Sequence, residues 1–178
     1  KEKMYNNHKN LKSVYAKAKL KATKHMLKLF IKKKFPSIVL RLYLAYGPKQ
    51  DINRFLPVVI SGCIKNKKFP CSNGNQLRDF IHVTDVVNAI FKSLKNKKAV
   101  GEIINLGSGK PKKIKNIILL IKKIVGRGQP QFGKVKLRKD EILKLYPNIS
   151  KARKIIKWIP RIEFNRGLKS TIFYYKNL

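Results

Sequence analysis

Apolar residues recur along the chain in two patterns, one typical of helices and the other of short buried strands. Helical spacing over residues 13–34 predicts a long first helix, and Ser13 can cap its start. Short β-branched runs predict strands of a parallel sheet at residues 37–43, 80–83 and 103–106. Further helices are predicted at residues 55–63, 85–94 (capped by Thr84), 115–125 and 164–175, with short ones near 140–145 and 149–157 and a loop over 126–137. This alternation of strands and helices predicts an α/β fold.

The composition is that of a folded and strongly basic protein. Hydrophobic residues make up 43% of the 178, enough for one packed domain or for part of a larger enzyme. The formal net charge is +35, from 43 basic and 8 acidic residues, a balance often found in proteins that bind nucleic acid. The lysines are scattered through every segment, however, and Lys, Ile and Asn share A/T-rich codons. We therefore favour a solvated basic surface over a nucleic-acid interface.

The remaining composition indicates neither a metal site nor a membrane segment. Cys63 and Cys71 lack metal-binding spacing and are expected to be free thiols in a reducing compartment. Residues 117–121 are typical of the apolar runs, which are far too short to span a bilayer. No signal peptide is recognisable, so we expect a cytoplasmic protein without membrane contact.

Three segments carry the candidate chemistry, and their order along the chain is what makes them specific. They are Tyr15-Ala-Lys-Ala-Lys19, residues 40–48 (LRLYLAYGP) and residues 78–86 (RDFIHVTDV). On a helix, Tyr15 and Lys19 share a face, so that the lysine can stabilise a phenolate and the tyrosine can act as acid and base. The spacing alone is common by chance, since Tyr5 and Lys9 also have it.

With these segments in this order, the chain resembles the C-terminal half of an extended short-chain dehydrogenase/reductase. That group contains NAD-dependent nucleotide-sugar epimerases, dehydratases and reductases, and the resemblance covers nearly the whole chain. It implies the C-terminal part of a Rossmann-type parallel sheet with a small α/β substrate-binding domain. The glycine fingerprint of the cofactor half is not found, so we expect the N-terminal dinucleotide-binding half to precede Lys1. The implied division is residues 1–46 and 80–106 for the NAD-binding domain, and 47–79 and 107–178 for the sugar-nucleotide domain.

The resemblance also implies an activity. A UDP-glucose 4-epimerase-like enzyme would form a transient 4-keto sugar, exchanging hydride with NAD and a proton with Tyr15, before epimerisation or dehydration. An NAD(P)-dependent 4-reductase is the alternative within the family; a basic nucleic-acid-binding protein and an inactive fragment are the alternatives outside it. Tyr15 and Lys19 would be catalytic and touch the cofactor, with Leu42 and Tyr43 beside it. The complete enzyme would be a homodimer, whereas the chain alone would be inactive.

By the same resemblance, a nucleoside-diphosphate sugar would be held at three places along the chain, the first of which is a helix start. They are Asn53, Arg54 and Phe55, then Arg78, then Arg138 with Glu141. A guanidinium fork matches phosphate oxygens, so Arg78 would grip the pyrophosphate. Arg138 would meet the phosphates and Glu141 the ribose, although both could instead be surface charges in so basic a chain.

Three further positions are informative. Leu44 stands where many members carry Asn or Gln against the sugar phosphate, and leucine cannot donate that hydrogen bond. We expect Asp79 to be structural, pairing with backbone or with an arginine. His82 is expected to be a buried positional residue rather than a general base.

Overall fold

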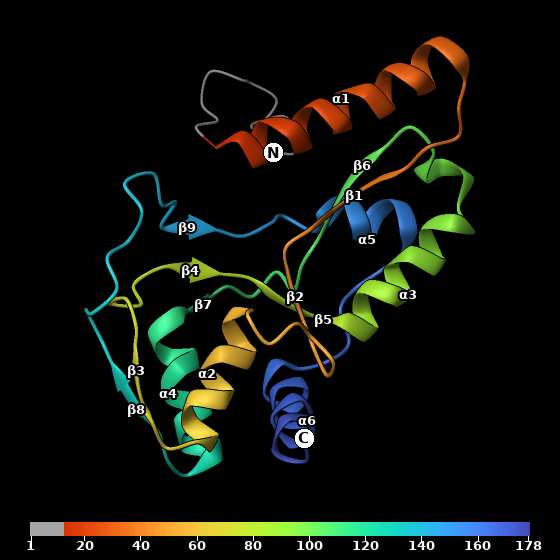
Figure 1. The fold of residues 1–178 in the computed structure, drawn as a ribbon. Coiled ribbons are helices and arrows are strands. Elements are labelled where there is room, and N and C mark those ends of the chain that lie inside the picture. Colours follow the sequence, from red (N-terminus) through yellow and green to blue (C-terminus); the bar gives the residue numbers. More distant parts are fainter. Residues whose placement is uncertain (1–12) are drawn as a thin grey trace.

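The structure, a computed structural model, describes residues 13–178 (Figure 1). Its helices are α1 (Val14–Lys33), α2 (Phe55–Ile64), α3 (Val83–Leu94), the 3-10 helix η2 (Lys97–Ala99), α4 (Ile114–Val125), α5 (Ser150–Ile156) and α6 (Phe164–Lys176). Its strands are β1 (Val39–Leu42), β2 (Leu44–Tyr46), β3 (Lys68–Pro70), β4 (Leu77–Arg78), β5 (Phe80–His82), β6 (Ile103–Leu106), β7 (Lys112–Lys113), β8 (Gln129–Gln131) and β9 (Lys144–Leu145). The α/β class predicted from the sequence is confirmed.

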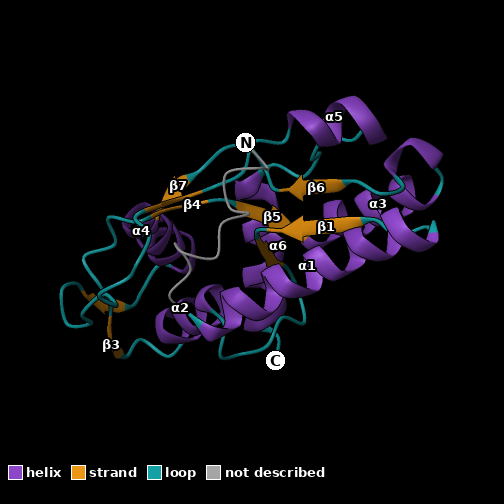
Figure 2. Ribbon diagram, turned by 90° about the horizontal axis from the view of Figure 1, so that it is seen from above, coloured by secondary structure: helices purple, strands orange, loops and turns teal. Residues whose placement is uncertain are grey.

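Two parallel strand pairs contain the three strands that the apolar runs predicted, β1, β5 and β6, together with β2, which was not predicted. β1 pairs with β6, with Val39 opposite Ile103, and β2 pairs with β5, with Leu44 opposite Phe80. Seen from above, β1 and β6 lie side by side and point the same way (Figure 2). Figure 1 shows α1 on one side of this pair and α3 with α5 on the other. The prediction that these strands run parallel is therefore confirmed.

A second group of elements packs through a core of its own. α2, α4 and α6 contact one another in the lower part of Figure 1. Ile60 of α2, Ile121 of α4 and Leu168 of α6 are completely buried in this core. Within each of these three helices the buried residues recur at helical spacing, which is why the sequence predicted the helices well.

The core beneath β1 and β6 is centred on Trp158, which is also completely buried. Trp158 packs with Ile81 and Ile104, and its indole Nε1 donates a hydrogen bond of 3.1 Å to the carbonyl oxygen of Asp85. Segments from both predicted domains thus meet in one core. The division into domains stays a prediction.

The first helix begins and ends as the sequence predicted. Ser13 caps α1, since its Oγ accepts a 3.1 Å hydrogen bond from the Ala16 amide. The helix ends at Lys33, immediately before Lys34 in the left-handed conformation and two residues before Phe35-Pro36. Tyr5 and Lys9 lie outside the described residues.

The predicted start of α3 was wrong. The helix begins at Val83, and its cap is His82 rather than Thr84. The imidazole Nδ1 of His82 accepts a 3.3 Å hydrogen bond from the Thr84 amide. An imidazole nitrogen can thus satisfy a first-turn amide in place of the Ser, Thr, Asp or Asn oxygen that sequence rules look for.

Two further predictions were wrong because partners far along the chain decide the local structure. The short helix expected at residues 140–145 is absent there; β9 pairs instead with β4, with Lys144 opposite Leu77. The loop expected at 126–137 contains β8, which pairs with β3 through Gln129 and Lys68. Both strands are very short and lack an apolar alternation, so the sequence carries no strand signal there.

A carboxylate holds the loop that follows Trp158 and gives a test of the fold. Asp85 is 4% exposed, and its Oδ1 and Oδ2 each accept a 2.9 Å hydrogen bond, from the amides of Arg161 and Ile162. Asp85→Ala is expected to lower the free energy of unfolding by about 2–4 kcal/mol, because both amides lose their partner. Urea denaturation measures this change. The exposed Asp140→Ala is the control and should stay within about 0.5 kcal/mol of wild type; equal effects of the two substitutions would contradict the assignment.

Candidate functional site

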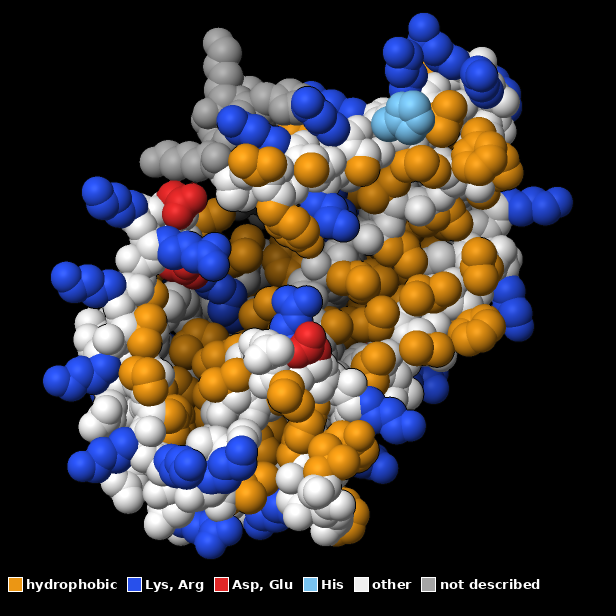
Figure 3. Space-filling model, viewed as in Figure 1, with side chains coloured by type: hydrophobic (Ala, Val, Ile, Leu, Met, Phe, Trp, Pro, Cys, Tyr) orange, Lys and Arg blue, Asp and Glu red, His pale blue; other side chains and the backbone are white. Residues whose placement is uncertain are grey.

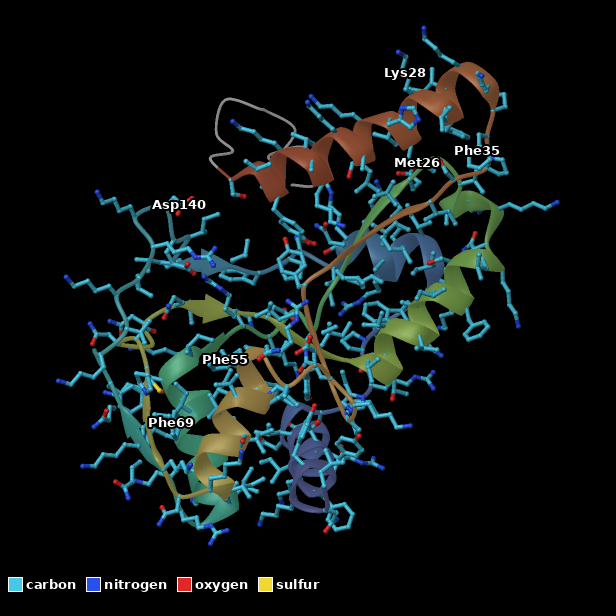
Figure 4. The ribbon with its side chains drawn as sticks, viewed as in Figure 1. Met26, Lys28, Phe35, Phe55, Phe69 and Asp140 are labelled. Carbon is cyan, nitrogen blue, oxygen red and sulfur yellow. The ribbon has the colours of Figure 1, made fainter. Side chains whose placement is uncertain are left out.

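A cavity of about 380 Å³ opens among α2, α4 and the segment 132–143, which we call the strap. Its floor is apolar, with Phe55 of α2 and Phe69 of β3 among its side chains (Figure 4). Figure 3 shows the molecule hollowed below α1, with hydrophobic side chains inside the hollow and Lys and Arg at its margin. The other lining residues are Leu44, Val58, Val59, Pro70, Cys71, Ser72, Gln76, Arg78, Ile114, Ile118, Val135, Lys136, Leu137, Arg138 and Glu141.

Arg78 is the most buried charged side chain of this cavity, with 9% of its surface exposed. Its Nη1 donates hydrogen bonds to the carbonyl oxygens of Leu77 (2.9 Å) and Leu143 (3.4 Å). Its Nη2 makes an ion pair with the Glu141 carboxylate from the strap. A buried guanidinium held on two sides presents its remaining N–H groups in a fixed direction, as anion binding requires.

The fold brings four of the six predicted substrate residues into one place. Phe55, Arg78, Arg138 and Glu141 come from three distant segments and all line the cavity. Leu44, the predicted departure from the family pattern, lines it too and is 42% exposed. An apolar floor with a few charged groups at one edge is the usual composition of a small-molecule site.

The other two predicted substrate residues lie just outside the cavity lining. Asn53 and Arg54 are exposed residues that precede α2. Arg54 occupies the cap position without a side-chain cap bond, and the Asn53 amide donates a 2.8 Å hydrogen bond to Asp51 Oδ1. The start of α2 therefore keeps amide groups that no side chain caps, beside Phe55 on the cavity wall.

The predicted catalytic pair is exposed on α1. Tyr15 is 73% exposed, and Lys19 Nζ lies 5.5 Å from the centre of its ring. Leu42 is 51% exposed at the carboxyl end of β1, and the Tyr43 amide just beyond it donates a 3.0 Å hydrogen bond to the Leu106 carbonyl. In open parallel sheets, ligands bind at the carboxyl ends of the strands, which is where these two residues lie.

Asp79 is structural, as its position in the sequence indicated. It is completely buried, and its Oδ1 and Oδ2 accept hydrogen bonds from the amides of Ser108 (2.5 Å) and Gly109 (2.7 Å). Burial raises the pKa of this carboxyl, while the same hydrogen bonds act to lower it. Asp79, which follows Arg78 in the chain, thus holds the turn after β6 in place. Gly107 in that turn has no room for a side chain, since a Cβ would lie 2.4 Å from Pro147 Cγ.

His82 is buried, 9% exposed, and burial lowers its pKa. Its Nδ1 caps α3, and its ring packs edge-on against Tyr46 with centroids 5.3 Å apart. Its Nε2 has no hydrogen-bond partner within residues 13–178. This arrangement suits a residue that holds α3 and Tyr46 in position, in agreement with the sequence-based expectation.

Several cavity residues gave no recognisable signal in the sequence. Phe69 and Cys71 face it from β3 and the residue after it, while Val135 and Leu137 face it from the strap. The residues between and after them line the cavity too, so these two segments show no alternation that a sequence pattern could reveal.

Across residues 13–178, no group of three or more His, Cys, Asp or Glu side chains is arranged to hold a metal ion. None of the helices in the same part of the chain is both long and apolar enough to cross a membrane.

Comparisons with known proteins agree on one family of enzymes. The family model described as "NAD dependent epimerase/dehydratase family" matches residues 1–107. CDP-abequose synthase of Salmonella typhimurium is 31% identical over 140 residues, covering 75% of this chain and 46% of that protein. Human dTDP-D-glucose 4,6-dehydratase is 31% identical over 170 residues, covering 91% of this chain and 48% of that protein. The chain spans about half the length of the curated relatives it matches.

Solved structures of the same kind share the fold. UDP-glucuronic acid 4-epimerase from Bacillus cereus, in complex with UDP-glucuronic acid and NAD, is 26% identical with a TM-score of 0.85. That match covers 92% of this chain and 52% of that one. dTDP-glucose 4,6-dehydratase from Bacillus anthracis, in complex with NAD, is 27% identical with a TM-score of 0.85 and is covered over 53% of its length by 93% of this chain.

The two free thiols give a chemical test of the cavity. Cys71 lines it and is 7% exposed, whereas Cys63 is completely buried, and burial raises the pKa of both thiols. Both should therefore react with iodoacetamide more slowly in the folded chain than in urea, since the thiolate is the reactive form. Peptide mass spectrometry over a time course should show Cys71 modified before Cys63. Modification of Cys63 first would contradict the cavity as described.

Proposed function

The chain belongs to the NAD-dependent epimerase/dehydratase family, and we propose that it supplies the catalytic tyrosine and the nucleotide-sugar cavity of such an enzyme. The substrate is a nucleoside-diphosphate sugar, converted through a transient 4-keto sugar to an epimer or a dehydrated product. A 4-reductase of the same family is the alternative outcome of the same first step.

The observation that carries this proposal is the gathering of four predicted residues around one cavity. Phe55, Arg78, Arg138 and Glu141 were selected by sequence, and they converge from α2, β4 and the strap. The apolar floor suits a nucleoside, and two arginines at its edge suit the charge of a diphosphate.

The proton chemistry belongs to α1. The Tyr15 phenolate, stabilised by the Lys19 ammonium, takes the proton of the sugar C4 hydroxyl, and the phenol that results returns a proton in the reverse step. NAD, when bound, supplies the hydride acceptor. Tyr15 on α1 and Leu42 at the carboxyl end of β1 are both exposed, and these residues with Lys19 and Tyr43 would contact its nicotinamide end.

The substrate contacts follow from the cavity and from the start of α2. Arg78 and Arg138 bind the diphosphate, Asn53 and Arg54 approach it from the start of α2, and Glu141 accepts from the ribose hydroxyls. Leu44 gives the sugar phosphate an apolar contact where a hydrogen-bond donor is frequent in the family, so the substrate is expected to differ.

We also propose that the complete enzyme is a homodimer. Val14 and Ile31 leave apolar surface exposed on α1, at 83% and 68% of their respective areas. A second α1 from another copy would cover such a surface.

Tyr15→Phe tests the catalytic assignment, in a form of the protein that converts a nucleotide sugar with NAD. Turnover is expected to fall by at least about 10²-fold, the usual contribution of general acid–base catalysis, with little change in NAD affinity. Steady-state kinetics and NAD titration measure the two effects. Tyr174→Phe on α6 is the control; a Tyr15→Phe enzyme with most of its turnover would remove Tyr15 from the mechanism.

Arg78→Ala tests the substrate assignment. Losing a charge-assisted pair with the diphosphate costs about 1.5–3 kcal/mol, so the Kd for UDP-glucose is expected to rise more than about tenfold. Calorimetry measures the change, and Arg153→Ala on the exposed face of α5 is the control. If both variants bind UDP-glucose as wild type does, Arg78 is not part of the site.

A further inference from the structure

Arg78 and Glu141 make an ion pair with each other, although the proposed function gives them different parts of the ligand. The side chains are 10% and 26% exposed, and 63 residues separate them in the chain. The pair joins β4 to the strap across the edge of the cavity.

Glu141 is the one acidic side chain among the described residues that line the cavity; the basic ones are Arg78, Lys136 and Arg138. A buried guanidinium without a nearby anion is costly, because burial removes the water that would solvate its charge. The Nη1 group of Arg78 is already satisfied by the Leu77 and Leu143 carbonyls, and the carboxylate meets Nη2. Glu141 thus occupies Nη2, the donor that an incoming phosphate would use.

The backbone keeps Glu141 near this donor. The Glu141 amide donates a 3.0 Å hydrogen bond to the Arg138 carbonyl, and the Leu77 amide donates one of 2.7 Å to the Leu143 carbonyl. β9, which follows, pairs directly with β4. With the strap held on both sides of Glu141, the carboxylate can leave Arg78 by turning about its side-chain bonds while the backbone stays in place.

We propose that Glu141 is an internal counter-ion for Arg78, which a diphosphate must displace and which then binds the ribose. This inference rests on the proposed function of the cavity and adds a selection rule to it. A ligand with only a diphosphate must break the ion pair and offers the displaced carboxylate no new hydrogen-bond donor. A ligand that also carries a ribose gives the displaced carboxylate new donors, so the site favours nucleoside diphosphates over free polyphosphate.

Glu141→Gln separates the competition for Arg78 from the binding of the ribose. Pyrophosphate and UDP are the probes, in calorimetric titrations of the 178-residue chain. Pyrophosphate is expected to bind at least about tenfold more tightly to the variant, since the carboxylate that competes with it for Arg78 is gone. UDP gains less, because the same substitution weakens its ribose contact. The ratio of the pyrophosphate Kd to the UDP Kd therefore falls.

Asp140→Asn is the matched control. It removes the same formal charge one residue away, from an exposed side chain at the outer edge of the strap (Figure 4). Its Kd ratio should equal that of wild type. In an Arg78→Ala background, Glu141→Gln should no longer tighten pyrophosphate binding, because the partner it competes for is absent.

The outcomes distinguish this inference from the function on which it rests. If wild type binds UDP but Glu141→Gln leaves the Kd ratio unchanged, the counter-ion role is overturned and the substrate site stands. If neither wild type nor any variant binds UDP or pyrophosphate, the proposed function fails and the counter-ion role with it. A thermal melt of each variant shows whether a change in binding reflects loss of fold.

Discussion

A buried guanidinium must have anionic or carbonyl partners, and the requirement at Arg78 organises the edge of the cavity. Two carbonyl groups and one carboxylate meet it, and two of these three partners come from the strap region. The same interaction therefore closes the cavity wall and fixes the direction of the donors that would bind an anion. Structure and proposed function depend on one side chain.

Buried carboxylates provide the rest of the framework in a similar way. Asp79 holds the turn after β6, and Asp85 holds the loop after Trp158, each by accepting two backbone amides. In a chain with 8 acidic residues against 43 basic ones, several of the few acids are thus used inside the molecule. The excess of lysine is left to the surface, which agrees with its even scatter through the sequence.

Much of the fold was predictable where burial is periodic. The helices with one apolar face and the parallel pair β1 and β6 were found, because period 3.6 and β-branched runs report burial directly. β4, β8 and β9 were missed, since strands of two or three residues exist only through their partners. Of the residues that line the cavity, Arg78, Arg138 and Glu141 were predicted site residues by resemblance to a family, whereas Phe69 and Leu137 were identified only from the placement of β3 and the strap around the cavity.

A crystal structure of this chain with UDP would test the central claim most directly. The account predicts diphosphate oxygens within about 2.7–3.2 Å of the Arg78 guanidinium, with the Glu141 carboxylate turned away from Nη2 and toward the ribose. UDP bound elsewhere, or bound in the cavity with the Arg78–Glu141 ion pair intact, would contradict it.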